Sequence, residues 1–280
     1  MRIALLQMTG GIDPAHNAAT IVDALGEAKA GGAQMLFTPE MSGLLDRDRK
    51  RAAGHLAVES EDGVLAAVRE AAAEQGVWVH LGSLALRADA DPAQGSGRLV
   101  NRGFVIDDSG AIRARYDKIH LFDVDLDTGE SWRESSVYDA GNRAVIADVP
   151  LGALGLSVCY DLRFADLYRA LSDSGATALA IPAAFTVPTG KAHWHVLMRA
   201  RAIESAAFVI AAAQYGHHED GRYTYGHSLV VDPWGEVLLD MGEGTGVGFA
   251  EIDRERLDDV RKRIPVLRHR RAFTAPEPAA

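Results

Sequence analysis

The order of strand-like and helix-like segments constrains the fold of this chain more than any other feature. Short apolar or alternating runs indicate strands, and apolar residues at helical spacing indicate helices. The strand-like segments are residues 2–8, 33–40, 77–86, 98–107, 111–121, 143–149, 151–159, 176–185, 208–216, 226–233, 236–241 and 246–253. Helix-like segments are residues 14–30, 60–76, 161–174, 193–207 and a short last helix.

These segments mix helical crossovers with hairpins such as the one across Trp234 and Gly235. Crossovers connect parallel strands and hairpins connect antiparallel ones, so we expect sheets of mixed direction. About a dozen strands are too many for one twisted sheet. The order therefore predicts an α/β fold of two stacked mixed β-sheets with helices on both outer faces. We expect a single domain over residues 1–272 and a flexible C-terminal tail over residues 273–280.

The charge and the cysteine content exclude several classes of function. The formal net charge is −10, from 39 acidic and 29 basic residues, so we expect no nucleic acid as partner. No run of eighteen apolar residues is present, and residues 1–11 are more typical of a first strand than of a signal peptide, so we expect no membrane partner. The single cysteine permits no internal disulfide, which favours a cytoplasmic location.

Three potentially reactive side chains lie at or near the ends of three predicted strands. Glu40, Lys118 and the single cysteine, Cys159, occupy these positions. Because ligands of open α/β sheets bind beyond the carboxyl ends of the strands, the three side chains could converge. Cys159 would then be a nucleophile, Glu40 its base, and Lys118 and the Tyr160 N–H donors to an oxyanion.

Activation of the thiol is the critical requirement of this interpretation. A free thiol is only about 3% thiolate at neutral pH. We expect the N-terminus of the helix at 161–174 and the charge of Lys118 to lower the pKa of Cys159. Each residue also has an ordinary explanation, as a core cysteine, a turn carboxylate or a solvated lysine. The residues alone leave a cysteine hydrolase and a structural cysteine both open.

Three local motifs resemble the signatures of the nitrilase superfamily of carbon–nitrogen hydrolases. They are TPE at 38–40, YDKIHLFD at 116–123 and SVCYDLRF at 157–164, and the likeness continues through 183–205 and 225–238. The resemblance implies a four-layer αββα sandwich that needs no metal and no cofactor. It also implies that Glu40 is the general base, Lys118 the oxyanion stabiliser and Cys159 the nucleophile.

The same resemblance implies a second glutamate that orients the site and contacts substrate. The matching segment is RESS at 133–136, so Glu134 is the candidate. The family usually has a proline before the following glycine, whereas this chain has Asp139, Ala140 and Gly141. The loop that carries Glu134 therefore departs from the family pattern.

Within the superfamily, the motifs are most similar to the Nit branch, and residues 211–235 resemble its amidases that act on deaminated glutathione. This likeness implies a small carboxylate-bearing amide as substrate, a cysteine thioester intermediate, and 2-oxoglutarate and cysteinylglycine as products. Sister amidases that act on 2-oxoglutaramate share the core and remain an alternative. It also implies a homodimer or a higher homo-oligomer, joined through residues 168–175 and 193–205.

Further residues are candidates for contacts with the substrate. Arg163, four residues after Cys159, is a candidate anchor for a substrate carboxylate, or it forms an ion pair with Asp161 or Asp166. Phe185 and Thr186 follow a predicted strand and are expected to wall the pocket, although Phe185 could equally belong to the core.

Two other interpretations remain open. His120 would share a strand face with Lys118, so a Cys–His pair is a rival. The histidine pairs at 193 and 195 and at 217 and 218 lack a cysteine or carboxylate at ligand spacing, so we expect no metal. A non-catalytic binding protein on the same fold is the remaining class, and slow alkylation of Cys159 at pH 7 would favour it.

Overall fold

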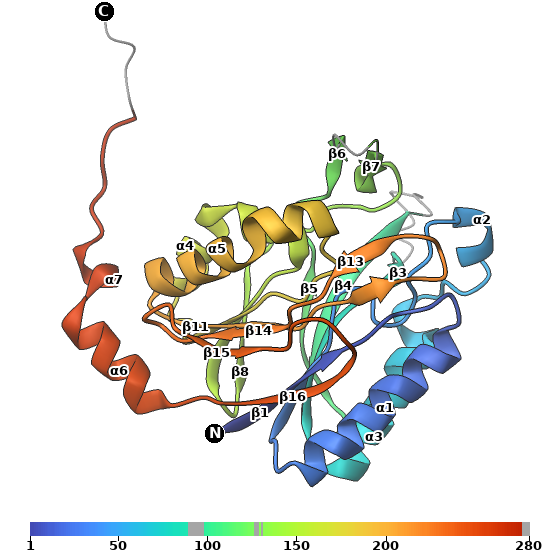
Figure 1. The fold of residues 1–280 in the computed structure, drawn as a ribbon, viewed down its shortest axis with the longest axis horizontal. Helices are drawn as coiled ribbons and strands as arrows, with labels where there is room; N and C mark the ends of the chain where they lie inside the picture. The colour runs from blue at the N-terminus through green and yellow to red at the C-terminus, as the bar shows by residue number, and fades with distance from the viewer. Residues whose placement is uncertain (89–97, 126–128, 130, 276–280) are drawn as a thin grey trace, which may run out of the picture.

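The computed structural model describes residues 1–88, 98–125, 129 and 131–275, and its framework is two six-stranded sheets (Figure 1). In spatial order, the first sheet contains β16 (Gly246–Glu251), β1 (Arg2–Gln7), β2 (Met35–Phe37), β3 (Trp78–Arg87), β4 (Leu99–Ile106) and β5 (Ile112–Asp117). The second contains β15 (Val237–Asp240), β14 (Leu229–Val231), β11 (Phe208–Ala211), β10 (Ala178–Ala180), β9 (Gly152–Leu156) and β8 (Val145–Val149).

Both sheets are mixed, as predicted. Strands β1, β2 and β3 are parallel, as are β9, β10 and β11, and the other neighbours pair antiparallel. Each parallel connection contains a helix. The four helices are α1 (Pro14–Ala30), α3 (Gly63–Gln75), α4 (Ala165–Asp173) and α5 (Val187–Ser205).

The layers follow from the side-chain alternation along the first strands. In β1, Ala4 and Leu6 pack with α1 and α3, whereas Ile3 and Leu5 belong to the core shared with the second sheet. This two-residue period is the one expected of a strand covered on both faces. Helices α4 and α5 pack on the second sheet through Tyr168, Trp194 and other buried residues. Figure 1 shows the two helix pairs on opposite sides of the molecule, which confirms the predicted αββα sandwich.

The first and last strands of the described chain pair with each other in the first sheet. Strand β16 lies antiparallel beside β1, with a register from Arg2 opposite Glu251 to Gln7 opposite Gly246. The Met1 ammonium group donates to the Ile252 carbonyl at 2.9 Å, and the Ile252 N–H donates to the Met1 carbonyl at 2.7 Å. The first sheet thus contains strands that are about 240 residues apart in the sequence.

Several predicted boundaries are wrong near the candidate site. The strand predicted to reach Glu40 ends at Phe37, because Pro39 has no N–H for a sheet ladder. The strands predicted to reach residues 121 and 159 end at Asp117 and Leu156. The helix predicted over 161–174 begins only at Ala165, after a 3₁₀ turn over Cys159–Arg163.

Three small elements were not predicted, and all lie beside the candidate site. They are α2 (Arg49–Ala52), the hairpin of β6 (Asp123–Asp125) and β7 (Ser131–Arg133), and the hairpin of β12 (Tyr215–His217) and β13 (Tyr223–Tyr225). Their strands are three residues long, which is too short for a periodic signal.

The C-terminal segment leaves the sandwich along α6 (Arg254–Arg263) and α7 (Val266–His269) (Figure 1). Phe273 is 82% exposed. The predicted tail continues over residues 276–280, which lie outside the described residues, and the domain boundary at 272 stays a prediction. Across the described ranges, every helix is too short or too polar to cross a membrane.

Candidate active site

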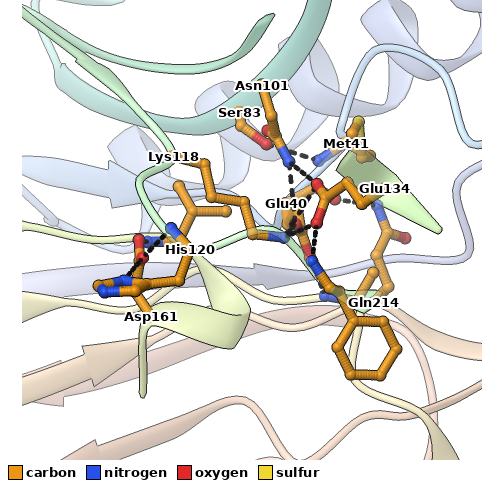
Figure 2. Close-up of polar contacts among 12 residues, drawn as sticks. Glu40, Met41, Ser83, Asn101, Lys118, His120, Glu134, Asp161 and Gln214 are labelled. Carbon is orange, nitrogen blue, oxygen red and sulfur yellow. Dashed lines mark hydrogen bonds and ion pairs between the residues drawn. The ribbon is translucent and has the colours of Figure 1, made fainter. Parts of the chain in front are cut away.

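Loops that follow three strands bring the predicted polar residues together where the two sheets meet. Glu40 follows β2, Lys118 follows β5, and Cys159 follows β9 of the second sheet. The Lys118 Nζ lies 2.9 Å from Glu40 Oε1 and 2.8 Å from Glu134 Oε2 (Figure 2). The structure thus places Glu134 in the same cluster, although its loop departs from the family pattern.

Glu40 is held at both carboxylate oxygens. Oε1 accepts from Lys118 and from the Asn101 amide at 3.0 Å, and Oε2 accepts from the Ala184 N–H at 2.9 Å. Burial alone would raise the pKa of Glu40, but the charge and the hydrogen bond of Lys118 hold it below its usual value of 4.5. A hydrogen bond with the Cys159 thiol acts in the same direction. Glu40 is therefore a carboxylate in contact with the thiol.

Lys118 is charged although it is buried. Its side chain is 2% exposed. Burial alone would lower the pKa of Lys118, but the charges of Glu134 and Glu40 raise it well above its usual range. A fixed ammonium group in a region of low dielectric is a strong electrostatic stabiliser of a developing anion.

Cys159 sits at a strained turn. Its φ is 49°, in the left-handed region that non-glycine residues rarely adopt. Its N–H donates to the Pro182 carbonyl at 2.9 Å. The N–H of Tyr160 has no acceptor among the described residues, which leaves it available to an oxyanion beside the thiol.

The expectation that the thiol has a lowered pKa is wrong. Burial raises the pKa of Cys159 well above its usual range, the charge of Glu40 raises it further, and Lys118 offsets these effects only in part. The helix expected to help begins six residues later, at Ala165. At neutral pH the thiol is protonated, so attack requires a base that removes its proton, and Glu40 is in contact with it.

This protonation state predicts how Cys159 reacts with alkylating agents. We expect slow alkylation by iodoacetamide at pH 7 and a rate that still rises above pH 9.0, the usual thiol value, because the pKa is raised. The measurement is the alkylation rate against pH, followed by mass spectrometry. A rate that is already at its maximum at pH 7 would contradict it. Slow alkylation is therefore the expected behaviour of an enzyme here and does not favour a binding protein.

Asp161 joins the cysteine turn to the Lys118 loop. Its buried carboxylate accepts from Tyr116 Oη at 2.7 Å and from the Val158 N–H at 2.8 Å. It also accepts from the His120 N–H at 3.0 Å and lies 2.6 Å from His120 Nδ1 (Figure 2). The His120 ring also stacks on Phe164, with centroids 3.6 Å apart. His120 is thus directed at Asp161, which weakens the Cys–His interpretation.

A substitution separates the two interpretations of His120. We expect His120→Asn to lower kcat/KM by less than about tenfold. Asparagine keeps a donor for Asp161, and a typical hydrogen bond contributes only roughly 1 kcal/mol. Steady-state kinetics beside Lys118→Ala provide the test. Full loss in the first variant with survival of the second would favour a Cys–His pair.

Asn101 is a site residue that the sequence analysis missed. It is 1% exposed on β4, and its Nδ2 donates to Glu40 Oε1 and, at 3.3 Å, to Glu134 Oε1. The signal was a buried amide in a strand that is apolar apart from Asn101 and Arg102, since buried polar groups are costly without partners. Asn101 holds the two carboxylates at a fixed separation.

A cavity of about 910 Å³ opens above the cluster. It is lined by Glu40, Lys118, Glu134, Cys159, Tyr160, Phe185 and Thr186, and by five arginines, Arg47, Arg49, Arg87, Arg133 and Arg222. Phe185 and Thr186 therefore wall the cavity, although Phe185 also packs on Trp194 at 5.0 Å.

Arg163 is absent from the described lining residues. Its guanidinium lies 5.9 Å from the Tyr160 ring and 5.4 Å from the Phe185 ring, and Nη1 is 3.3 Å from His193 Nδ1. It pairs with neither Asp161 nor Asp166 among the ion pairs of the described residues. Arg163 packs behind two cavity walls and does not face the substrate space.

Three of the four histidines in the two predicted pairs have other contacts. His193 contacts Arg163, His217 stacks on Tyr223 at 4.4 Å, and His218 contacts the Gly10 carbonyl and Thr224. Within the described residues, one group of metal-capable side chains lies together, His195, His227 and Asp240. Each of its histidines is 2.9 Å from an Asp240 oxygen, so mutual hydrogen bonds account for the group.

Known proteins resemble this chain both in sequence and in fold. The carbon-nitrogen hydrolase family model matches residues 2–262. A deaminated glutathione amidase from Yersinia enterocolitica is 39% identical over 271 residues, which cover 96% of this chain and 92% of that protein. The crystal structure of the Caenorhabditis elegans NitFhit protein superposes with a TM-score of 0.86 at 37% identity, over 96% of this chain and 65% of that one.

A third relative carries a modified active site. An amidase from Nesterenkonia sp. AN1, 26% identical with a TM-score of 0.80, has been solved as a glutamate-to-glutamine mutant with the acetamide moiety of fluoroacetamide on its active-site cysteine. The match covers 97% of this chain and 94% of that one. The chain described here belongs to the carbon-nitrogen hydrolase family and is an amidase of the Nit branch, which hydrolyses carbon–nitrogen bonds other than peptide bonds.

Proposed function

We propose that this amidase cleaves deaminated glutathione into 2-oxoglutarate and cysteinylglycine through a thioester on Cys159. The contact of Lys118 with both Glu40 and Glu134 beside the buried thiol carries this proposal. This contact supports a mechanism in which a carboxylate base and a fixed cation act on a neutral thiol.

In the first half-reaction, Glu40 takes the thiol proton while Sγ attacks the amide carbonyl carbon. The oxyanion of the tetrahedral intermediate is stabilised by the Lys118 ammonium group and the Tyr160 N–H, each worth roughly 3 kcal/mol of barrier by analogy with other oxyanion donors. Glu40 then gives its proton to the departing amine, the carbon–nitrogen bond breaks, and the thioester remains.

In the second half-reaction, Glu40 takes a proton from water, and the resulting hydroxide attacks the thioester. Collapse of the second tetrahedral intermediate breaks the carbon–sulfur bond and releases 2-oxoglutarate. Glu40 returns the proton to the thiolate. Glu134 is proposed to position Lys118, since its Oε2 accepts from both the Lys118 ammonium group and the Phe122 N–H at 2.7 Å.

The relatives and the cavity volume support the larger substrate. The Yersinia relative is named for deaminated glutathione. A volume of about 910 Å³ is near the upper end of the roughly 300–1,000 Å³ common for small-molecule pockets, which suits a tripeptide-sized amide better than 2-oxoglutaramate.

One assay tests the substrate. We expect kcat/KM for deaminated glutathione to exceed that for 2-oxoglutaramate at least tenfold, or about 1.4 kcal/mol in transition-state binding. The readout is release of 2-oxoglutarate. The reverse preference would favour an ω-amidase, and no release from either substrate would favour a binding protein.

We also propose a homodimer through α4 and α5. On α5, Val196 is 68% and Ile203 50% exposed, and they lie seven residues apart on one face. Trp234 extends this apolar surface, since the adjacent Gly235 carbonyl accepts from Arg199 of α5 at 2.8 Å. The cytoplasmic location and the absence of a nucleic-acid partner stay predictions.

Light scattering tests the dimer. We expect a dimer at micromolar concentration and a monomer for the double variant Val196→Glu, Ile203→Glu, because two buried charges would oppose the apolar contact. Ala30→Glu, on an exposed position of α1, is the matched control and should stay dimeric. A monomeric wild-type protein would refute the proposal.

A further inference from the structure

We propose that Arg222, assisted by Arg47, binds the carboxylate of the leaving group. Both residues line the cavity, and the part of the wall that they form is called the rim here. In deaminated glutathione this group is the terminal carboxylate of the cysteinylglycine part, which 2-oxoglutaramate lacks. The inference rests on the proposed function and deepens it, because it names the residues that would distinguish the two substrates.

The Arg222 guanidinium is fixed along one edge and free along the other. Its Nε and Nη2 lie 2.7 and 2.6 Å from Asp220 Oδ2, and its Cζ lies 4.9 Å above the Trp132 ring. Its Nη1 has no acceptor among the described residues. A guanidinium held in place by a buried carboxylate and an aromatic face is preorganised for a carboxylate at its open edge.

Arg47 lies against the same turn. Its backbone N–H donates to Asp220 Oδ2 at 3.0 Å, and its Nη2 is 2.9 Å from where a Cβ would stand on Gly221. Its side chain has no hydrogen-bond acceptor among the described residues and is exposed. Asp220 therefore binds the guanidinium group of Arg222 and only the backbone of Arg47.

The described charges at this rim leave the Arg47 guanidinium group without an acidic partner. Among the described acids that line the cavity, Asp46 is already bound to Arg51 through two hydrogen bonds, at 2.7 and 2.8 Å. Asp220 neutralises only one of the two guanidinium groups. An excess of positive charge in a chain of net charge −10 favours an anionic ligand at this position.

Hydrogen bonds join the rim to the segment that contacts Glu40. The Tyr225 N–H of β13 donates to the Phe185 carbonyl at 2.9 Å, and Thr224 pairs with Thr186 in an isolated antiparallel β-bridge. Phe185 and Thr186 directly follow Ala184, whose N–H donates a hydrogen bond to Glu40. Burial raises the pKa of Tyr138, the charge of Glu134 raises it further and the charge of Arg222 lowers it, so Arg222 acts within electrostatic range of the cluster.

The experiment compares Arg222→Gln with wild type on three substrates: deaminated glutathione, its C-terminal glycinamide analogue, and 2-oxoglutaramate. We expect KM for deaminated glutathione to rise about 10- to 100-fold, as for a lost hydrogen bond to a charged group, with kcat little changed. We expect kcat/KM for the glycinamide analogue and for 2-oxoglutaramate to change less than about threefold.

Two further variants keep the test clear of folding effects. Arg47→Gln leaves the Asp220–Arg222 pair intact and should raise KM for deaminated glutathione alone, by a smaller factor. Arg49→Gln is the matched control, because it removes a lining arginine that is bound to Ser136 Oγ at 2.7 Å. Arg49→Gln should not alter the ratio between the substrates.

Equal losses on all three substrates in Arg222→Gln, with no effect of Arg47→Gln, would mean that Arg222 only braces its hairpin and would overturn the inference. An unchanged KM would overturn it as well. Both results leave the proposed function standing, because wild type still prefers deaminated glutathione. Failure of wild type to cleave deaminated glutathione would overturn the proposed function and this inference together.

Discussion

Substitution of Glu40 by glutamine is expected to lower kcat/KM for amide hydrolysis by about 10² to 10⁴, the range usual for loss of a general base. The thiol pKa is raised by burial and by the Glu40 charge, so the thiol needs a base, and Glu40 is hydrogen-bonded to it. The reaction loses both activation of the nucleophile and protonation of the amine. Steady-state kinetics with deaminated glutathione measure the effect.

An activated ester of 2-oxoglutarate should show which half-reactions need Glu40. In Glu40→Gln, one influence that raises the pKa of Cys159 is gone while Lys118 remains, so some thiolate forms. A good leaving group needs no proton, so we expect acylation of Cys159 and a thioester that persists, visible by mass spectrometry. Glu59→Gln is the matched control, because Glu59 forms ion pairs with Arg102 and Arg115 away from the cavity. This variant should turn the ester over at the wild-type rate.

Two results would contradict this assignment. Turnover of Glu40→Gln near the wild-type rate would mean that another base acts. The pH profile provides the second result. Because the pKa of Glu40 is held below 4.5, its base form persists to that pH, and the acid limb of kcat/KM is expected below 4.5. A limb near neutral pH would indicate a different base.

Substitution of Lys118 by methionine is expected to abolish activity and to reduce the free energy of unfolding at pH 7 by about 3–5 kcal/mol, the range for breaking a buried ion pair. Two carboxylates, Glu40 and Glu134, would then face each other without the cation they share. Denaturant unfolding measures the loss. Lys29→Met, at an exposed position of α1, is the control and should change stability little.

The sign of the pH dependence distinguishes this cause from lost packing. In wild type, the lowered pKa of Glu40 contributes stability that is present above the unfolded pKa and is lost as pH falls. In Lys118→Met, burial of Glu40 is opposed only by its hydrogen bonds with Cys159 and Ala184, so its folded pKa rises and the variant gains stability as pH falls. We therefore expect the difference from wild type to shrink toward pH 4.

A double variant completes the test of Lys118. Adding Glu134→Gln to Lys118→Met removes one of the two facing charges, so much of the lost stability should return while activity stays absent. A difference that does not depend on pH, with no recovery in the double variant, would mean that Lys118 acts only through its packing.

The fold could be predicted because its evidence is local and repeated. The alternation of Ile3, Ala4, Leu5 and Leu6 assigns each residue of β1 to one of two covered faces. The alternation of crossovers and hairpins fixes the mixed direction of both sheets. Element ends were predicted less well, because a single distant contact decides them. Asp161, for example, binds Tyr116, His120 and Val158 and so holds a 3₁₀ turn where helical spacing predicts an α-helix.

The candidate site depends on contacts that no local pattern records. The distance from Lys118 to Glu40 is set by the register of β2 to β5, and the approach of Cys159 is set by how the second sheet packs on the first. Asn101 reaches Glu40 from β4, and Arg222 reaches the cavity from the β12–β13 hairpin, which is distant from β4 in sequence. For the same reason Arg163, close to Cys159 in sequence, is separated from the cavity by the rings that wall it.

The pairing of β16 with β1 has a consequence for how the chain acquires its structure during synthesis. Strand β1 is synthesised before its antiparallel neighbour, Gly246–Glu251, which follows about 240 residues later. Until then one edge of β1 stays open, and the sheet that positions Glu40 and Lys118 is incomplete. The fold therefore forms after most of the chain has been made, and the nascent protein needs protection of that edge against pairing with other chains.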